Sequence, residues 1–149
     1  MSRVQAKIEI DAPIERVWDT VMDPDRLGEW VTIHRAVRSV SRRPLTTGST
    51  MSQTLRMHGV SFHVEWTLSD VTPPHRADWD GHGPAGSRAS ICYRLDGGDG
   101  KPTLFEYTNE FTAPGGRLGN VASRVLVGAA SEREARNSLA RLKDLLERK

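Results

Sequence analysis

Four uncharged polar side chains occupy positions where the sequence pattern predicts the buried face of a β-sheet. Gln53 stands in one alternating run of apolar residues, Tyr107 and Asn109 stand in another, and Tyr93 lies opposite them. A buried amide without a partner costs about 1–3 kcal/mol, so such groups either pair with one another and with water or orient a ligand. A tyrosine hydroxyl can also serve as a weak general acid beside an enolate oxygen. Both a structural and a ligand-binding role remain open for this group.

Metal binding and covalent catalysis are disfavoured by the other reactive side chains. None of the five histidines has the paired spacing of a zinc site. Cys92, the only cysteine, alternates to the outer face of its strand, and the sequence holds no Gly-x-Ser-x-Gly motif. We therefore expect no metal and no cofactor, and we assign no catalytic residue. A cysteine without an intrachain partner is typical of the reducing cytoplasm.

The polar candidates lie in a region of period two that runs from about residue 33 to residue 111. Its clearest part is a hairpin over residues 50–68, with His58-Gly59 as a two-residue turn that pairs Met57 with Val60. This register exposes His63 and Glu65 to solvent. The side chains predicted to face inward are Met51, Gln53, Leu55, Met57, Phe62, Val64 and Trp66.

A second hairpin is predicted over residues 89–111. We expect Tyr93 to face Phe105 and Ile91 to face Tyr107, across an odd loop of three or five residues that glycines allow. Between the two hairpins, Ala77 and Trp79 predict a further strand that ends in the glycine-rich loop 81–86.

Helices are predicted at the two ends of this region. Before it, alternation over residues 4–10 predicts a strand, the 3,4 spacing over 14–21 predicts a short helix, and Asp25 is expected to cap a second short helix. After the turn 114–116, two apolar stripes predict a long helix. The first stripe spans residues 118–129, and its members Val121, Val125 and Ala129 are expected to line a cavity. The second consists of Ala135, Leu139, Leu142 and Leu146, and its three leucines are expected to be fully packed against the sheet. A break near residues 128–131 is an alternative to one continuous helix, which is favoured.

This order of elements resembles the START/Bet v 1-like (SRPBCC) superfamily and, within it, the polyketide cyclase/dehydrase family. The resemblance rests on residues 10–18 with Asp23, Leu27 and Trp30, on Gly48 and Trp66, on the turn 114–116 and on the ending 139–147. It implies one α+β domain over residues 1–149, of helix-grip type. Such a domain has a curved antiparallel sheet of about seven strands around a long C-terminal helix, with two short helices after the first strand.

The resemblance leaves the function open, because the family contains lipid and hormone binders, cyclases and chaperone-type partners. A curved sheet touches one helix closely along only part of its length, so we expect a ligand cavity between them. The candidate ligand-binding residues are Trp30, Met51, Gln53, Leu55, Trp66, Trp79, Tyr93, Tyr107, Asn109, Val121 and Val125.

Three functions fit this picture. The first is a carrier or sequestering protein for a hydrophobic small molecule such as a lipid, a polyketide or another aromatic compound. The second is a polyketide cyclase/dehydratase-type enzyme that uses the same pocket, and the third is an interaction module whose interior is filled by side chains. The carrier is favoured because no residue pair in the sequence forces a reaction.

The charge and hydropathy patterns disfavour other partners. The formal net charge is only +2, and the basic residues of the last helix alternate with Glu132, Glu134, Asp144 and Glu147, as on a solvated face. We therefore expect no nucleic-acid binding. No apolar run approaches the roughly 20 residues of a membrane span, and the start of the chain reads as strand rather than signal peptide. We expect a cytoplasmic monomer or homodimer.

Overall fold

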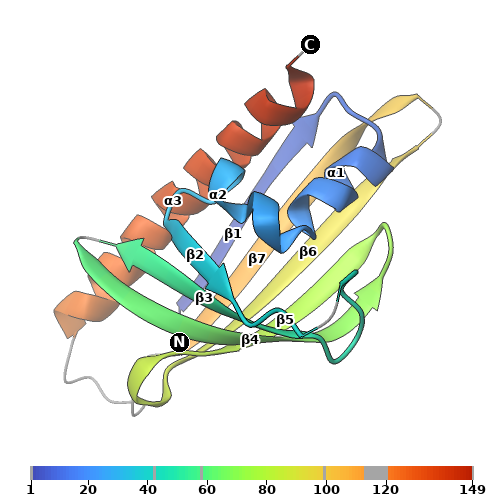
Figure 1. Ribbon diagram of the computed structural model, residues 1–149. Coiled ribbons are helices and arrows are strands. Elements are labelled where there is room, and N and C mark those ends of the chain that lie inside the picture. Colours follow the sequence, from blue (N-terminus) through green and yellow to red (C-terminus); the bar gives the residue numbers. More distant parts are fainter. Residues whose placement is uncertain (1, 42, 58, 99, 113–120, 149) are drawn as a thin grey trace.

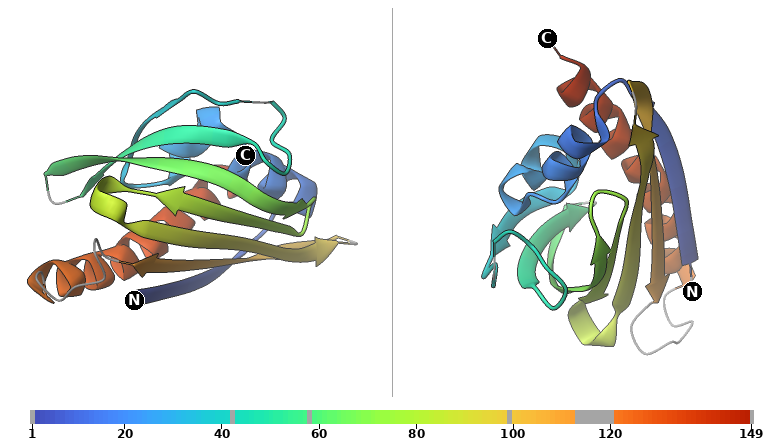
Figure 2. Two further views of the ribbon diagram at one scale, coloured as in Figure 1. Left: turned by 90° about the horizontal axis from the view of Figure 1, so that it is seen from below. Right: turned by 90° about the vertical axis from the view of Figure 1, so that its right-hand side faces the viewer.

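The computed structural model describes residues 2–41, 43–57, 59–98, 100–112 and 121–148. Within these ranges, seven antiparallel strands form one sheet in the order β1-β7-β6-β5-β4-β3-β2 (Figure 1). The sheet curls into a half-barrel whose concave side holds the helices (Figure 2). The strands are β1 (Ser2–Ile10), β2 (His34–Arg38), β3 (Thr50–Met57), β4 (Val60–Thr72), β5 (Arg76–His82), β6 (Arg88–Gly98) and β7 (Lys101–Thr112). The helices are α1 (Ile14–Val21), α2 (Leu27–Trp30) and α3 (Val121–Glu147), with 3₁₀ turns at Pro24–Arg26 and Pro84–Gly86. The helix-grip prediction is confirmed.

The first hairpin forms with the predicted register. Met57 pairs with Val60 and Gln53 pairs with Val64 on β3 and β4. The inward set is buried or half-buried, whereas His63 and Glu65 are exposed. A slip of one residue would have turned every side chain of this hairpin to the opposite face, so the alternation alone specified which residues meet the interior.

The predicted register of the second hairpin is wrong by two residues. Tyr93 faces Tyr107 rather than Phe105, and Phe105 faces Leu95 instead. The cause is that β6 continues through an irregularity after Asp96, and Gly98 pairs with Lys101, so the connection is shorter than expected. Gly98 has a φ of 141°, which glycine alone accepts readily. Because the shift is even, the inward faces are unchanged.

The cap of the second helical segment is Asp23, not Asp25 as predicted. The side chain of Asp23 accepts a hydrogen bond from the backbone N–H of Asp25 at 2.9 Å. Pro24 follows it at the first position of the 3₁₀ turn, where a missing N–H costs nothing, and this turn leads into α2. The short helix α1 forms as predicted and buries Val17 and Trp18.

The long helix α3 is continuous from Val121 to Glu147, so the alternative of a break near residues 128–131 is not observed. The side chains of the first stripe (Val121, Val125 and Ala129) and the turn 114–116 lie outside the described residues. The second stripe (Ala135, Leu139, Leu142 and Leu146) is buried, as predicted. Leu139 was expected to be fully packed, but it and Ala135 also border the space between α3 and the sheet.

Hydrogen bonds fasten the end of α3 to β1 and the residue that follows it. Lys143 Nζ donates to the backbone carbonyl of Glu9 at 3.0 Å, and the backbone N–H of Asp11 donates to Glu147 Oε2 at 2.8 Å. This last bond is the main reason that the pKa of Glu147 lies below its ordinary value. Among the described residues, no helix combines the length and the apolar character that crossing a membrane requires.

Leu142 provides a test of this packing. Its side chain is 0% exposed, and Leu142→Ala should lower the free energy of unfolding by about 2–5 kcal/mol, as truncation of core leucines does. Arg141→Ala, at the neighbouring exposed position, should change it by no more than about 0.5 kcal/mol. Urea unfolding measures both, and equal losses would contradict the assignment of Leu142 to the core.

Candidate functional site

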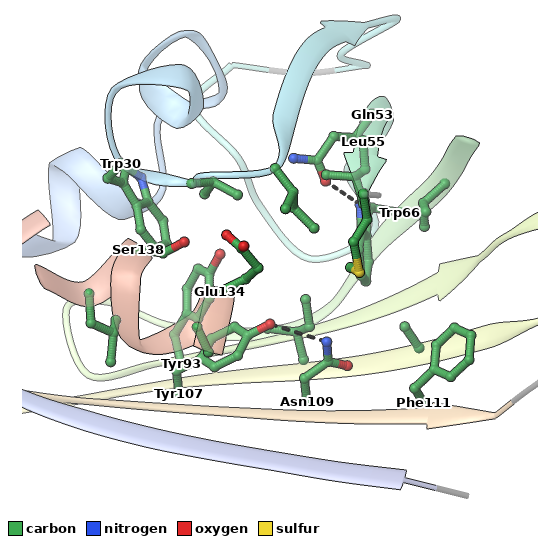
Figure 3. A pocket seen from close by; sticks show the side chains of 18 of the residues that line it. Trp30, Gln53, Leu55, Trp66, Tyr93, Tyr107, Asn109, Phe111, Glu134 and Ser138 are labelled. Atoms are coloured by element: carbon green, nitrogen blue, oxygen red, sulfur yellow. Dashed lines mark hydrogen bonds between the residues drawn. The ribbon is translucent and has the colours of Figure 1, made fainter. Parts of the chain in front are cut away.

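A cavity of about 150 Å³ lies between the concave face of the sheet and α3 (Figure 3). Its walls come from α2 and the segment after it, from β3, β4, β6 and β7, and from α3. The described residues that line it are Trp30, Val31, Ile33, Gln53, Leu55, Met57, Phe62, Val64, Trp66, Ala89, Ile91, Tyr93, Tyr107, Asn109, Phe111, Glu134, Ala135, Ser138 and Leu139.

The structure brings most of the candidate residues to this pocket. Those that line it are Trp30, Gln53, Leu55, Trp66, Tyr93, Tyr107 and Asn109. Met51 and Trp79 do not line it and are core residues, with 7% and 5% of their surface exposed. The side chains of Val121 and Val125 lie outside the described residues.

Glu134 and Ser138 line the pocket but were not predicted to do so. The sequence assigned Glu134 to a solvated face of the last helix, and that assignment is wrong. The available signal was the i,i+4 spacing of Glu134 and Ser138, each directly before a buried residue of the second stripe, Ala135 and Leu139. A residue next to the buried stripe of a helix faces the gap that opens where the sheet curves away from that helix. Glu134 and Ser138 are such residues.

One wall of the pocket is fixed by a chain of three side chains. Trp66 Nε1 donates to Gln53 Oε1 at 2.9 Å. An indole N–H can only donate, so it sets the orientation of the amide, and Gln53 Nε2 then donates to His34 Nδ1 at 2.9 Å. His34 must accept at Nδ1 and carry its proton on Nε2. Partial burial lowers the pKa of His34, which agrees with a neutral imidazole.

Gly81 allows Trp66 to occupy its place in this wall. The two residues are paired on neighbouring strands, and a Cβ on Gly81 would lie 2.6 Å from the Trp66 ring. No side chain tolerates that distance, so glycine is required for the ring to lie across β5. The position of Gly81 thereby supports the hydrogen bond from Trp66 to Gln53.

A second polar group lies on β7. Asn109 Nδ2 donates to Tyr107 Oη at 3.2 Å (Figure 3). Among the described residues, Asn109 Oδ1 is buried without a partner. The Tyr107 oxygen is used as an acceptor here, so its own proton is free to be donated.

Both tyrosines of the pocket remain protonated at neutral pH. Burial raises the pKa of Tyr107 to about 12, although the hydrogen bond from Asn109 opposes the shift. Burial raises the pKa of Tyr93 further, and the neighbouring Tyr107 adds to this shift. The hydroxyls are therefore hydrogen-bond donors rather than phenolates. Tyr93 is held by edge-to-face contacts with Trp30 and Phe105, whose ring centroids lie 6.1 and 5.4 Å away.

A third polar group lies where α3 meets the segment after α2. Thr32 Oγ1 donates to Glu134 Oε2, and the backbone N–H of Thr32 donates to Ser138 Oγ at 3.1 Å. Nearby in the lining, Trp30 Nε1 is buried with no acceptor among the described residues. Among all the residues that the structure describes, no three histidine, cysteine, aspartate or glutamate side chains come together as metal ligands would.

The curled sheet, the long helix and the pocket between them define a helix-grip protein of the SRPBCC superfamily. A family model described as polyketide cyclase / dehydrase and lipid transport matches residues 1–147, and the chain belongs to this family. The resemblance seen in the sequence is thereby confirmed.

Two relatives from Mycobacterium tuberculosis are distant in sequence. Toxin Rv0910 of Mycobacterium tuberculosis is 25% identical over 95 residues, which cover 64% of this chain and 66% of that protein. The chain thus spans about two thirds of the length of that relative. The uncharacterized protein Rv1546 of the same organism is 27% identical over 131 residues, which cover 86% of this chain and 90% of that protein.

Solved structures show the same fold. The Zhui aromatase/cyclase from Streptomyces sp. R1128 superposes with a TM-score of 0.82 at 18% identity, over 98% of this chain and 93% of that one. DynU16, a putative protein of the dynemicin biosynthetic locus, superposes with a TM-score of 0.69 at 21% identity, over 99% of this chain and 48% of that one.

The partial burial of His34 predicts a dependence of stability on pH. Because the pKa of His34 is lowered in the folded protein, the unfolded chain binds more protons below its ordinary value of 6.5. The free energy of unfolding should therefore fall as the pH drops below 6.5, and His34 should contribute no slope well above it. Urea unfolding from pH 5 to 8 should show a smaller slope for His34→Gln, which keeps an acceptor for Gln53. The same slope in both proteins would contradict this role.

Proposed function

We propose that this protein binds a hydrophobic small molecule of aromatic or polyketide type between the sheet and α3, as a carrier or sequestering protein. The observation that carries the proposal is the cavity with its aromatic walls. Apolar side chains that border an unfilled space of about 150 Å³ lose packing contacts, which lowers the stability of the fold. A module that needed only its surface would gain stability by filling this space, so the cavity argues against the interaction-module hypothesis.

The size and walls of the cavity limit the ligand. A volume of about 150 Å³ is enough for one benzene-sized ring and is below the 300–1,000 Å³ of sites for drug-sized ligands. The walls include Trp30, Trp66, Tyr93 and Tyr107, whose faces and edges suit stacking against an aromatic ring. The described cavity therefore fits a single ring, either a small aromatic molecule or one ring of a larger one.

An enzyme of polyketide cyclase/dehydratase type is the second candidate. The observation in its favour is that Tyr93 and Tyr107 bring two protonated hydroxyls to one cavity. The same observation ranks it second, because an efficient general acid has a pKa near the working pH. Burial moves the pKa of both hydroxyls further above neutral pH. The hydroxyls therefore stay protonated, which suits them to hold a carbonyl oxygen by hydrogen bonds.

Filling the cavity tests the proposed function. Ala135→Leu adds a larger side chain to the lining from α3 and should weaken binding of toluene at least tenfold. Ala140→Leu makes the same change at an exposed position of the same helix and should leave binding unchanged. Calorimetric titration with toluene measures both, and native mass spectrometry of the purified protein shows whether a natural ligand accompanies it. Toluene binding that is absent from the unaltered protein, or equal in both variants, would refute the proposal.

Asn109→Leu separates carrier from enzyme. The variant removes the amide that holds the Tyr107 hydroxyl, so binding of acetophenone should weaken by about 0.5–1.5 kcal/mol, the net value of one hydrogen bond. Binding of α-methylstyrene, which has the same shape without the carbonyl oxygen, should be unchanged or stronger. Equal effects on both probes would make Asn109 structural. Loss of turnover of a poly-β-keto substrate with binding retained would instead favour the enzyme, since the amide would then act on charge that develops in the transition state.

A further inference from the structure

The pocket has one charged residue among the described residues that line it, and this residue is Glu134. Its carboxylate points from α3 toward the interior of the pocket (Figure 3). One carboxylate oxygen, Oε2, accepts from Thr32 Oγ1, and the other has no hydrogen-bond donor within the described ranges. An acceptor with free capacity is thus available to a ligand on the pocket side of α3.

The surroundings hold this carboxylate in place but do not neutralise it. Thr32 is itself fixed, because its backbone N–H donates to Ser138 Oγ one helical turn after Glu134. No lysine or arginine occurs among the described lining residues, so a negatively charged ligand would meet a like charge without a counter-ion. Trp30 also lines the pocket, and its Nε1 is buried with no acceptor among the described residues.

We propose that Glu134 sets the ligand specificity of the pocket: it admits neutral aromatic molecules that carry a hydrogen-bond donor, such as a phenolic hydroxyl or an aromatic amine, and it excludes aromatic carboxylates. The inference rests on the proposed binding function and goes beyond it by naming the ligand chemistry. A carboxylate acceptor forms stronger hydrogen bonds than a neutral one, so a ligand that supplies a donor is favoured over a hydrocarbon of the same shape. A ligand that supplies only negative charge cannot use the free oxygen.

Four single-ring probes test this selection: toluene, phenol and aniline, which have nearly the same shape, and benzoate. The unaltered protein should bind phenol and aniline at least tenfold more tightly than benzoate at pH 7.5. Glu134→Gln should weaken the binding of phenol about 3- to 10-fold, because a neutral amide oxygen replaces the carboxylate. It should change the affinity for toluene by less than twofold. The same variant should bind benzoate at least tenfold more tightly. Nuclear magnetic resonance titrations measure all four affinities.

Glu132→Gln is the matched control, because it removes the same charge from an exposed position two residues earlier on α3. It should leave all four affinities within twofold. Benzoate binding as tight as phenol in the unaltered protein would overturn the role of Glu134, as would equal losses of phenol and toluene in Glu134→Gln. If that variant does not fold, the ranking of phenol over benzoate in the unaltered protein decides the question. Failure of toluene and phenol alike to bind the unaltered protein would refute the binding function itself, and the selection with it.

Discussion

The packing of one helix against a strongly curved sheet is the constraint on which the rest of the structure depends. α3 contacts the sheet closely at its C-terminal end, where Leu142 and Leu146 are fully buried and Lys143 and Glu147 bond to β1 and to Asp11 beside it. Toward Glu134 the sheet curves away, and the side chains of the helix meet a cavity instead of a packed wall. The pocket is therefore a consequence of geometry, and two of its polar residues, Glu134 and Ser138, come from the same helix that anchors the fold.

The alternation of apolar residues accounts for how much of the fold was predictable. A period of two determines the face of each side chain, which is why the inward set of β3 and β4 was correct. The second hairpin shows the limit of this signal: alternation is unchanged by a shift of two, so it could not distinguish Phe105 from Tyr107 as the partner of Tyr93. That choice was made by the irregularity between Asp96 and Gly98, which has no signature in the pattern beyond its glycines.

The site was less predictable because it depends on where elements dock. Glu134 belongs to a helix face that is solvated in an isolated helix and enters a cavity only when the sheet curves beneath it. His34 is the first residue of β2. Its role depends on hydrogen bonds that run from Trp66 on β4 through Gln53 on β3 to its ring. Met51 shows the reverse: it shares the inward face with Gln53 and is buried in the core outside the cavity. The alternation identifies the inward face, and only the tertiary structure divides that face into core and pocket.

The polar groups of the pocket bear on whether it binds a ligand or catalyses a reaction. Tyr107 can donate a hydrogen bond from β7, whereas Glu134 can accept one on the side of α3, so the two groups would interact with different polar atoms of one ligand. The burial that makes these interactions strong also raises the pKa of both tyrosines and keeps them protonated at neutral pH. Groups in that state orient a ligand without exchanging protons with it, unless negative charge develops on the oxygen that they hold. Binding therefore requires nothing beyond the geometry already present, whereas catalysis on the same scaffold requires a substrate that generates such a charge.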